Sequence, residues 1–210
     1  MDNDEKILEL RKMKGELLSN IALPLREANL VFGEGNINCQ VMFIGEAPGA
    51  NEDRVGRPFV GRGGQLLDEI IRSIGWKRED VYITNIVKRR PPENRDPLPA
   101  EIEAYKPFLT QQIEIINPRM IVTLGRFAMN YFLPAAKITN DHGRAIIVDG
   151  RIIFPVYHPA AALRATSMKD VFRADFQKIP KILSAEKDAA DLEATKAKAE
   201  RERPKQHGLF

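Results

Sequence analysis

Polar side chains follow three apolar runs of the sequence, at places where the chain must turn. Asn85 ends the run "VYITN", His158 follows "RIIFPVY", and "GEAPGANED" overlaps the end of "VMFIG". The Gly and Pro residues of the last stretch predict a tight turn that exposes backbone N–H groups. An Asn amide presents one acceptor and two donors, and a His at a strand end can point at a ligand. Each feature alone also fits a turn cap or a plain connection, so its position in the fold decides its meaning.

An aromatic residue and a basic loop add to these features. Phe59 lies between Pro58 and Val60 in a loop rich in Gly and Arg. It is either a core anchor or a stacking surface for a flat ligand such as a nucleobase. The loop "KRRPPENR" follows soon after Asn85 and combines positive charge with two prolines that hold an extended shape. This loop is either a solvated surface segment or a grip for phosphate groups.

The elements that must position these residues alternate between strand and helix. Four apolar runs bounded by turn signals predict strands at residues 41–45, 81–87, 120–125 and 151–159. Helical spacing and helix-start signals predict helices at residues 65–74, 99–116 and 126–132. This alternation predicts an α/β fold with a mostly parallel sheet. Ligands bind at the carboxyl ends of the strands in such sheets, which is where the unusual stretches lie.

The composition predicts one soluble domain followed by a charged tail. The chain has 210 residues, 43% of them hydrophobic, and a formal net charge of +3 that permits a polyanionic partner without requiring one. Residues 184–210 hold six Lys/Arg and six Asp/Glu, which predicts a helical or disordered tail and leaves residues 1–183 as the domain. The single cysteine, Cys39, excludes an internal disulfide and suits a reducing compartment. Without a long apolar run, the sequence predicts a cytoplasmic protein.

Five segments occur in a fixed order between residues 29 and 180: "VFGEGN", "GEAPGANEDRVGRPFVGRGGQLLDEII", "DVYITNIVKRRPPENRDPLPAEIEAY", "INPRMIVTLGRFA" and "YHPAAALR". This series resembles the uracil-DNA glycosylases of family four. The resemblance implies a three-layer α/β/α sandwich with a central four-stranded, mostly parallel sheet. It also implies a monomeric enzyme that flips uracil out of DNA and hydrolyses its N-glycosidic bond, which leaves an abasic site for base excision repair.

The resemblance assigns uracil-binding roles to individual residues. It implies that Phe59 stacks on uracil and that Asn85 reads the N3 and O4 edge of the base. The turn around Ala47 and Gly49 would line the same pocket. His158 would lie near O2 of uracil, where negative charge develops as the bond breaks.

The remaining implied roles concern water and DNA. The Asp that positions water in family one is replaced here by Ala47, which leaves Glu46 or Glu52 as candidate catalytic carboxylates, or a water held mainly by backbone groups. Leu163 is the candidate apolar wedge that fills the hole left by the flipped base. The residues expected to contact DNA are Lys88, Arg90, Arg95, Arg62, Leu163 and Arg164.

The sequence departs from the family at the iron–sulfur cluster. Typical members bind a four-iron cluster through four cysteines, and an ungapped alignment places Leu18, Ile21, Arg89 and Tyr105 at those positions. None of these side chains can replace a thiolate ligand. We therefore expect no cluster, no other metal and no cofactor. We also expect Leu18, Ile21 and Tyr105 to pack as an apolar substitute that fixes the N-terminal helix to the domain.

Two alternatives and one further partner remain open. A protein that binds or traps uracil in DNA without turnover is one alternative, although "KRRPPENR" lacks the histidine of trapping relatives. A nucleotide- or flavin-binding protein is the other, although no G-x-G-x-x-G loop follows a strand. The terminal "QHGLF" resembles peptides that dock on the bacterial sliding clamp, with Gln206, Leu209 and Phe210 as anchors.

Overall fold

The computed structural model describes residues 1–185 and contains a six-stranded sheet with the strand order β1-β3-β2-β4-β6-β5. The four inner strands are parallel, and the two outer strands are antiparallel to their neighbours. The strands are β1 (Glu34–Gly35), β2 (Val41–Gly45), β3 (Tyr82–Asn85), β4 (Met120–Leu124), β5 (Ile146–Val148) and β6 (Arg151–Val156). The expected parallel core is confirmed, but the expectation of four strands is wrong. The two extra strands are short edges of two and three residues, too short to show a hydrophobic period.

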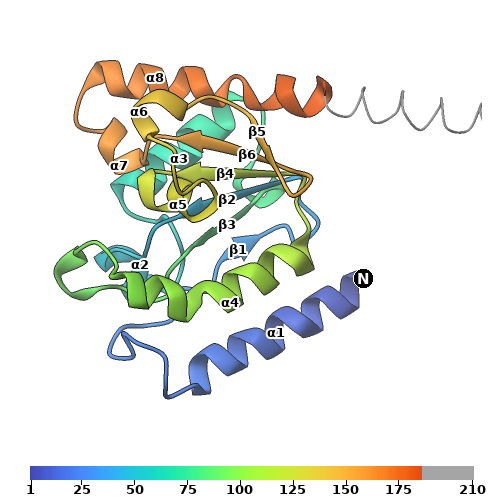
Figure 1. Ribbon diagram of the computed structural model, residues 1–210, viewed down its shortest axis with the longest axis vertical. Coiled ribbons are helices and arrows are strands. Elements are labelled where there is room, and N and C mark those ends of the chain that lie inside the picture. Colours follow the sequence, from blue (N-terminus) through green and yellow to red (C-terminus); the bar gives the residue numbers. More distant parts are fainter. Residues whose placement is uncertain (186–210) are drawn as a thin grey trace, which may run out of the picture.

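Helices cover both faces of the sheet, so the predicted three-layer α/β/α sandwich is confirmed (Figure 1). Met42 and Ile44 of β2 pack in the hydrophobic cluster of α1 and α4, whereas Val41 and Phe43 pack in the cluster of α3 and α8. This alternation is what a strand buried on both faces requires. The helices are α1 (Asn3–Ser19), α2 (Ala50–Val55), α3 (Arg62–Ser73), α4 (Pro99–Ile116), α5 (Arg126–Phe132), α6 (Ile138–Asp141), α7 (Pro159–Ala162) and α8 (Thr166–Phe176), with 3-10 turns η1 (Arg78–Asp80) and η2 (Pro92–Asn94).

The N-terminal helix α1 packs through a different set of residues from the one expected. Leu10, Met13 and Leu17 are buried, at spacings of three and four residues that define one face of a helix. Leu18 is 52% exposed and Ile21 is 84% exposed. Their expected packing is therefore wrong, because Leu18 lies one position off the buried face and Ile21 lies beyond the helix end. Tyr105 of α4 is fully buried as expected.

A buried arginine joins the N-terminal segment to the domain. Arg89 is 5% exposed, and its guanidinium donates hydrogen bonds to the backbone carbonyls of Leu17 at 3.2 Å and Ala28 at 2.5 Å. The neighbouring Tyr105 hydroxyl donates to the carbonyl of Pro24 at 2.8 Å. Hydrogen bonds to the backbone, and not the expected apolar packing, therefore fix the N-terminal segment to the domain.

These residues do not fit an iron–sulfur cluster. Arg89 and Tyr105 stand at two of the four positions where the resemblance implies cysteine ligands, and neither a guanidinium nor a phenol is a thiolate donor. Cys39 lies just before β2, at the amino end of the strands, and burial raises the pKa of its thiol to about 11. Within residues 1–185 no group of three or more His, Cys, Asp or Glu side chains is arranged to hold a metal ion.

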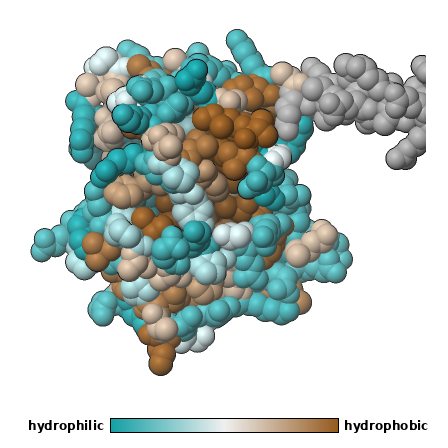
Figure 2. All heavy atoms as spheres, in the orientation of Figure 1, coloured by the Kyte–Doolittle hydropathy of each residue, from teal (hydrophilic) through white to brown (hydrophobic). Residues whose placement is uncertain are grey.

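The surface is mostly hydrophilic. Figure 2 shows polar residues over most of one face, with apolar residues gathered over the β5–β6 edge of the sheet below α8. No helix among the described residues is long and apolar enough to cross a membrane. The predicted tail, residues 184–210, lies outside the described residues from residue 186 onward, and so do Gln206, Leu209 and Phe210.

Candidate active site

A pocket of about 520 Å³ lies at the carboxyl ends of β2, β3 and β6. This is the place where parallel α/β sheets bind ligands. The pocket brings together most of the predicted site residues, which come from four separate stretches of the chain. Those on its wall are Glu46, Ala47, Gly49, Glu52, Phe59, Arg62, Asn85, Arg95, His158 and Arg164.

Asn85 and Phe59 meet over a glycine. Asn85 is 2% exposed at the end of β3, where it pairs with Gly45 of β2. A Cβ atom at position 45 would collide with both the Asn85 amide oxygen and the Phe59 ring, so only glycine lets the two side chains converge there. Within residues 1–185 the amide oxygen of Asn85 has no hydrogen-bond partner. Because an unpaired buried acceptor costs free energy, this atom is suited to a ligand that brings a donor.

His158 lies beside Phe59 as a neutral ring. Its Nδ1 atom accepts a hydrogen bond from the backbone N–H of Ala160 at 3.2 Å, which leaves the ring proton on Nε2. Burial lowers the pKa of His158 to about 4, although Glu52 acts in the opposite direction. The ring centroids of His158 and Phe59 are 5.9 Å apart, with a tilt of 36°. At neutral pH His158 is therefore a neutral donor through Nε2–H.

Glu46 has the electrostatics of a proton acceptor. Burial and the nearby Asp96 raise its pKa to about 7, while Arg126 acts to lower it. Arg126 is in turn paired with Asp96 at 2.6 Å. A carboxyl group that titrates near neutrality can take a proton from water under physiological conditions. No sequence pattern indicates this arrangement, because Asp96 and Arg126 look like ordinary surface charges.

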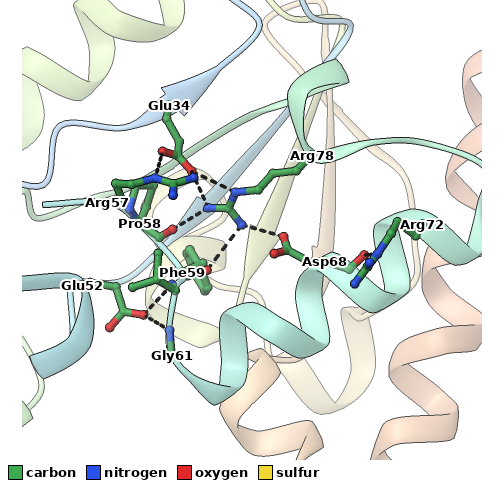
Figure 3. Close-up of polar contacts among 10 residues, drawn as sticks. Glu34, Glu52, Arg57, Pro58, Phe59, Gly61, Asp68, Arg72 and Arg78 are labelled. Atoms are coloured by element: carbon green, nitrogen blue, oxygen red, sulfur yellow. Dashed lines mark hydrogen bonds and ion pairs between the residues drawn. The ribbon is translucent and has the colours of Figure 1, made fainter. Parts of the chain in front are cut away.

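Glu52 is engaged by the loop that carries Phe59. Its Oε1 atom accepts hydrogen bonds from the backbone N–H groups of Val60 and Gly61, each at 2.8 Å (Figure 3). A carboxylate oxygen that accepts two N–H groups is committed to holding that backbone. Of the two candidate carboxylates, Glu46 is therefore the one whose surroundings suit proton transfer.

The expectation that Lys88 faces DNA is wrong. Lys88 is fully buried, and its amine donates to the Thr84 hydroxyl at 2.6 Å, the Asn85 carbonyl at 2.8 Å and the Gln112 amide oxygen at 2.7 Å. Burial lowers the pKa of this amine well below its ordinary value. The chain turns directly after Asn85, so the Lys88 side chain folds back beneath the strand end and three acceptors satisfy it.

The other residues expected to contact DNA differ in their exposure and in their hydrogen-bond and ion-pair partners. Arg62 and Arg164 are exposed at the pocket. Arg90 donates to the Asn94 amide oxygen at 2.7 Å. Arg95 forms a two-pronged ion pair with Glu101, at 2.6 and 2.8 Å. Leu163, 38% exposed, follows directly after α7 and does not line the pocket.

Comparisons with known proteins agree with this geometry. The family model described as "Uracil DNA glycosylase superfamily" matches residues 32–180. The type-4 uracil-DNA glycosylase of Thermotoga maritima is 41% identical over 187 residues, which cover 87% of this chain and 97% of that protein. The type-4 uracil-DNA glycosylase of Sulfurisphaera tokodaii is 44% identical over 182 residues, 81% of this chain and 83% of that protein. That of Saccharolobus solfataricus is 46% identical over 172 residues, 75% and 77% of the two chains.

The matched region includes every described element that contributes to the pocket, from β2 to α7. The identities extend over most of both chains, beyond any single motif. On this basis the chain belongs to the uracil DNA glycosylase superfamily and groups with its type-4 members.

Proposed function

We propose that this protein is a DNA repair enzyme that hydrolyses the N-glycosidic bond between uracil and deoxyribose in DNA and leaves an abasic site. The observation that carries the proposal is the convergence of a buried amide, an aromatic ring and a neutral imidazole in one pocket, namely Asn85, Phe59 and His158. Residues 1–183 form the catalytic domain. The superfamily and the type-4 relatives support the same activity.

Selection of uracil rests on Asn85. Its amide oxygen, unpaired within the described chain, accepts the N3–H of uracil, and its NH₂ group donates to O4. Cytosine presents an acceptor at N3 and a donor at N4, so the same amide would meet like groups. A buried site that leaves polar groups unpaired rejects the wrong base strongly. Phe59 stacks on the flipped base and offsets part of the cost of its extrusion.

Bond cleavage uses His158 and Glu46. As the bond between N1 and C1′ breaks, its electron pair goes to uracil, and negative charge grows on O2. The Nε2–H of neutral His158 donates to that oxygen and stabilises the charge. Water adds to the oxocarbenium-like C1′ atom and gives its proton to the carboxylate of Glu46.

Contacts to the DNA backbone come from the rim of the pocket. Arg62 and Arg164 are exposed there, and Arg90 lies on the neighbouring loop. Leu163 is the wedge that enters the base stack when uracil leaves it. Arg95 contributes less charge, because Glu101 already pairs with it.

An oligonucleotide with a single uracil tests the activity. We expect many turnovers, release of free uracil and an alkali-labile site. A gel-stable adduct, or stoichiometric binding without uracil release, would show a binding or trapping protein instead. Parallel substrates with hypoxanthine or a thymine mispair define the base range. Asn85→Ala and His158→Ala should each lower kcat/KM by about 100-fold to 1,000-fold, whereas the exposed Glu103→Gln should not change it.

We also propose that the enzyme works in the cytoplasm as a monomer and docks on a sliding clamp through Gln206, Leu209 and Phe210. A pull-down with purified clamp compares the full chain with a variant that lacks residues 206–210. Retention only of the full chain supports the docking. Equal retention of both chains would reject it.

A further inference from the structure

Phe59 stands in a backbone conformation that L-residues rarely adopt. Its φ angle is 50°, and its ring is 7% exposed beside Gly45 and His158. Such a conformation persists only where the surroundings over-determine it, and residues held in this way gather at functional sites. The groups that fix this backbone therefore decide where the ring stands.

Charged side chains bind both peptide groups that flank the Cα atom of Phe59. In the peptide group before Cα, the carbonyl of Pro58 accepts from the guanidinium of Arg78 at 2.5 Å. In the peptide group after Cα, the carbonyl of Phe59 accepts from Arg78 at 3.4 Å, and the N–H of Val60 donates to Glu52 at 2.8 Å (Figure 3). Because the orientations of these two rigid peptide planes define φ and ψ of Phe59, the contacts fix its backbone.

Arg78 is itself held rigidly by two carboxylates. Its Nε atom donates to Glu34 at 2.9 Å, and its Nη1 atom donates to Asp68 at 2.6 Å (Figure 3). The Arg78 side chain is 18% exposed. A planar guanidinium supplies several donors in fixed directions, which a lysine ammonium cannot reproduce. Arg78 therefore links β1, α3 and the Phe59 loop through one rigid group.

The first turn of α3 presses on the same loop. A Cβ atom at Gly64 would collide with the carbonyl group of Phe59, so the helix approaches this peptide as closely as its backbone allows. This approach leaves the Phe59 carbonyl little room to rotate. The Arg78 contact and the packing of α3 therefore hold the same peptide plane.

We propose that Arg78 is a positioning residue for uracil excision, which holds the Phe59 ring in the pocket wall through the carbonyl groups of Pro58 and Phe59. The inference rests on the proposed stacking of Phe59 on uracil. Arg78 does not line the pocket, so its influence on the substrate passes through Phe59.

Kinetics with single-stranded uracil DNA tests the role of Arg78 in the wild-type and Phe59→Ala backgrounds. We expect Arg78→Met and Arg78→Lys to raise KM and the inhibition constant of free uracil about tenfold, with a smaller change in kcat, because stacking acts on bound base and transition state alike. In the Phe59→Ala background the same substitutions should change neither constant further. Equal effects in both backgrounds, or none in the wild-type background, would overturn the proposal.

Arg57→Met is the matched control. Arg57 pairs with the same Glu34 carboxylate at 2.6 Å, but its side chain is 57% exposed, and within residues 1–185 it does not hydrogen-bond the carbonyls of Pro58 or Phe59. We expect its KM to stay within about twofold of wild type, since an exposed ion pair contributes little. A tenfold rise in this control would mean that the Glu34 cluster, and not the contact of Arg78 with the loop, sets the effect.

Amide hydrogen exchange at Val60 and Gly61 separates this inference from the stacking role itself. We expect faster exchange in Arg78→Met than in wild type, because the loop loses one of its two anchors. If exchange rises but Phe59→Ala leaves KM unchanged, the loop is held as described and the stacking assignment fails. If exchange stays unchanged, Arg78 does not hold the loop and the inference fails.

Discussion

The carboxyl group of Glu46 should make the activity of the pocket depend on pH. Its pKa is raised to about 7 by burial and by Asp96. A general base must be deprotonated, so we expect kcat/KM to rise with pH and to level off above about pH 7. Glu46→Gln should be slow and should lose that rise. A wild-type profile that stays flat between pH 5 and 8 would contradict the assignment of Glu46 as base.

The same group predicts an effect on stability that does not depend on activity. The folded pKa of Glu46 lies above the unfolded value, so stability from its neutral form is present below pH 4.5 and is lost as pH rises through about 7. Glu46→Gln stays neutral throughout. Its free energy of unfolding should therefore exceed that of wild type by about 2 kcal/mol at pH 8 and by little at pH 4.5. Chemical denaturation at both pH values measures this, with Glu103→Gln as an exposed control.

Substitutions of Lys88 and Arg62 should have opposite effects on stability and on the salt dependence of DNA binding, although both residues are basic. Lys88 is fully buried and its amine donates to three acceptors inside the protein, so it does not reach a DNA phosphate. Lys88→Met should lower the free energy of unfolding by about 2 kcal/mol, because buried acceptors lose their donor, and should leave the salt dependence of DNA binding unchanged. Arg62→Met should reduce the slope of log K against log salt by about 1 and leave stability unchanged.

Binding titrations at several salt concentrations, together with denaturation curves, compare the two variants. The slopes must be measured with DNA that the enzyme does not cleave, so that binding alone is observed. If Lys88→Met reduced the salt slope as much as Arg62→Met, the amine would contact phosphate in the complex, contrary to its buried position.

At the scale of elements, helix α1 packs on the domain through one face only. Leu17 is fully buried against the domain, whereas the adjacent Leu18 is 52% exposed. Leu17→Ala should lower the free energy of unfolding by about 3 kcal/mol through loss of burial and a cavity, while Leu18→Ala should change it by less than about 0.5 kcal/mol. Thermal or chemical denaturation measures both. Equal effects of the two substitutions would mean that α1 docks in another rotation.

The elements that the sequence predicted well have local signals. Helix α4 begins at Pro99, and β2 ends at Gly45, both as expected from proline and glycine at element ends. The residues that were misread depend on distant partners. Lys88 is satisfied by Gln112, and Arg89 reaches Leu17, at separations of 24 and 72 residues. A local reading of "KRR" as solvent-exposed charge cannot reveal partners that only the fold supplies.

The candidate site shows the same division. Asn85 and His158 could be predicted, because they follow apolar runs and because parallel strands bring their carboxyl ends together. Arg78 and Asp96 could not. They stand in short polar turns with no pattern of their own. Their importance comes from the hydrogen bond of Arg78 to Phe59 and from the effect of the Asp96 charge on Glu46.

At the scale of the whole molecule, we predict that the chain holds its N-terminal segment without a metal cluster. Protein purified in the absence of oxygen should contain far less than one iron atom per chain and should show no visible absorption band. An iron assay and an absorption scan check this. A stoichiometric cluster would contradict the prediction, since the chain has one cysteine and four thiolates are needed to bind one cluster within a chain.

The buried Arg89 also couples the docking of the N-terminal segment to the folding of the domain. Its bonds to the carbonyls of Leu17 and Ala28 form as the chain folds, and they need nothing from outside the polypeptide. If the iron assay finds no cluster, the enzyme needs no cluster-assembly machinery before it can act.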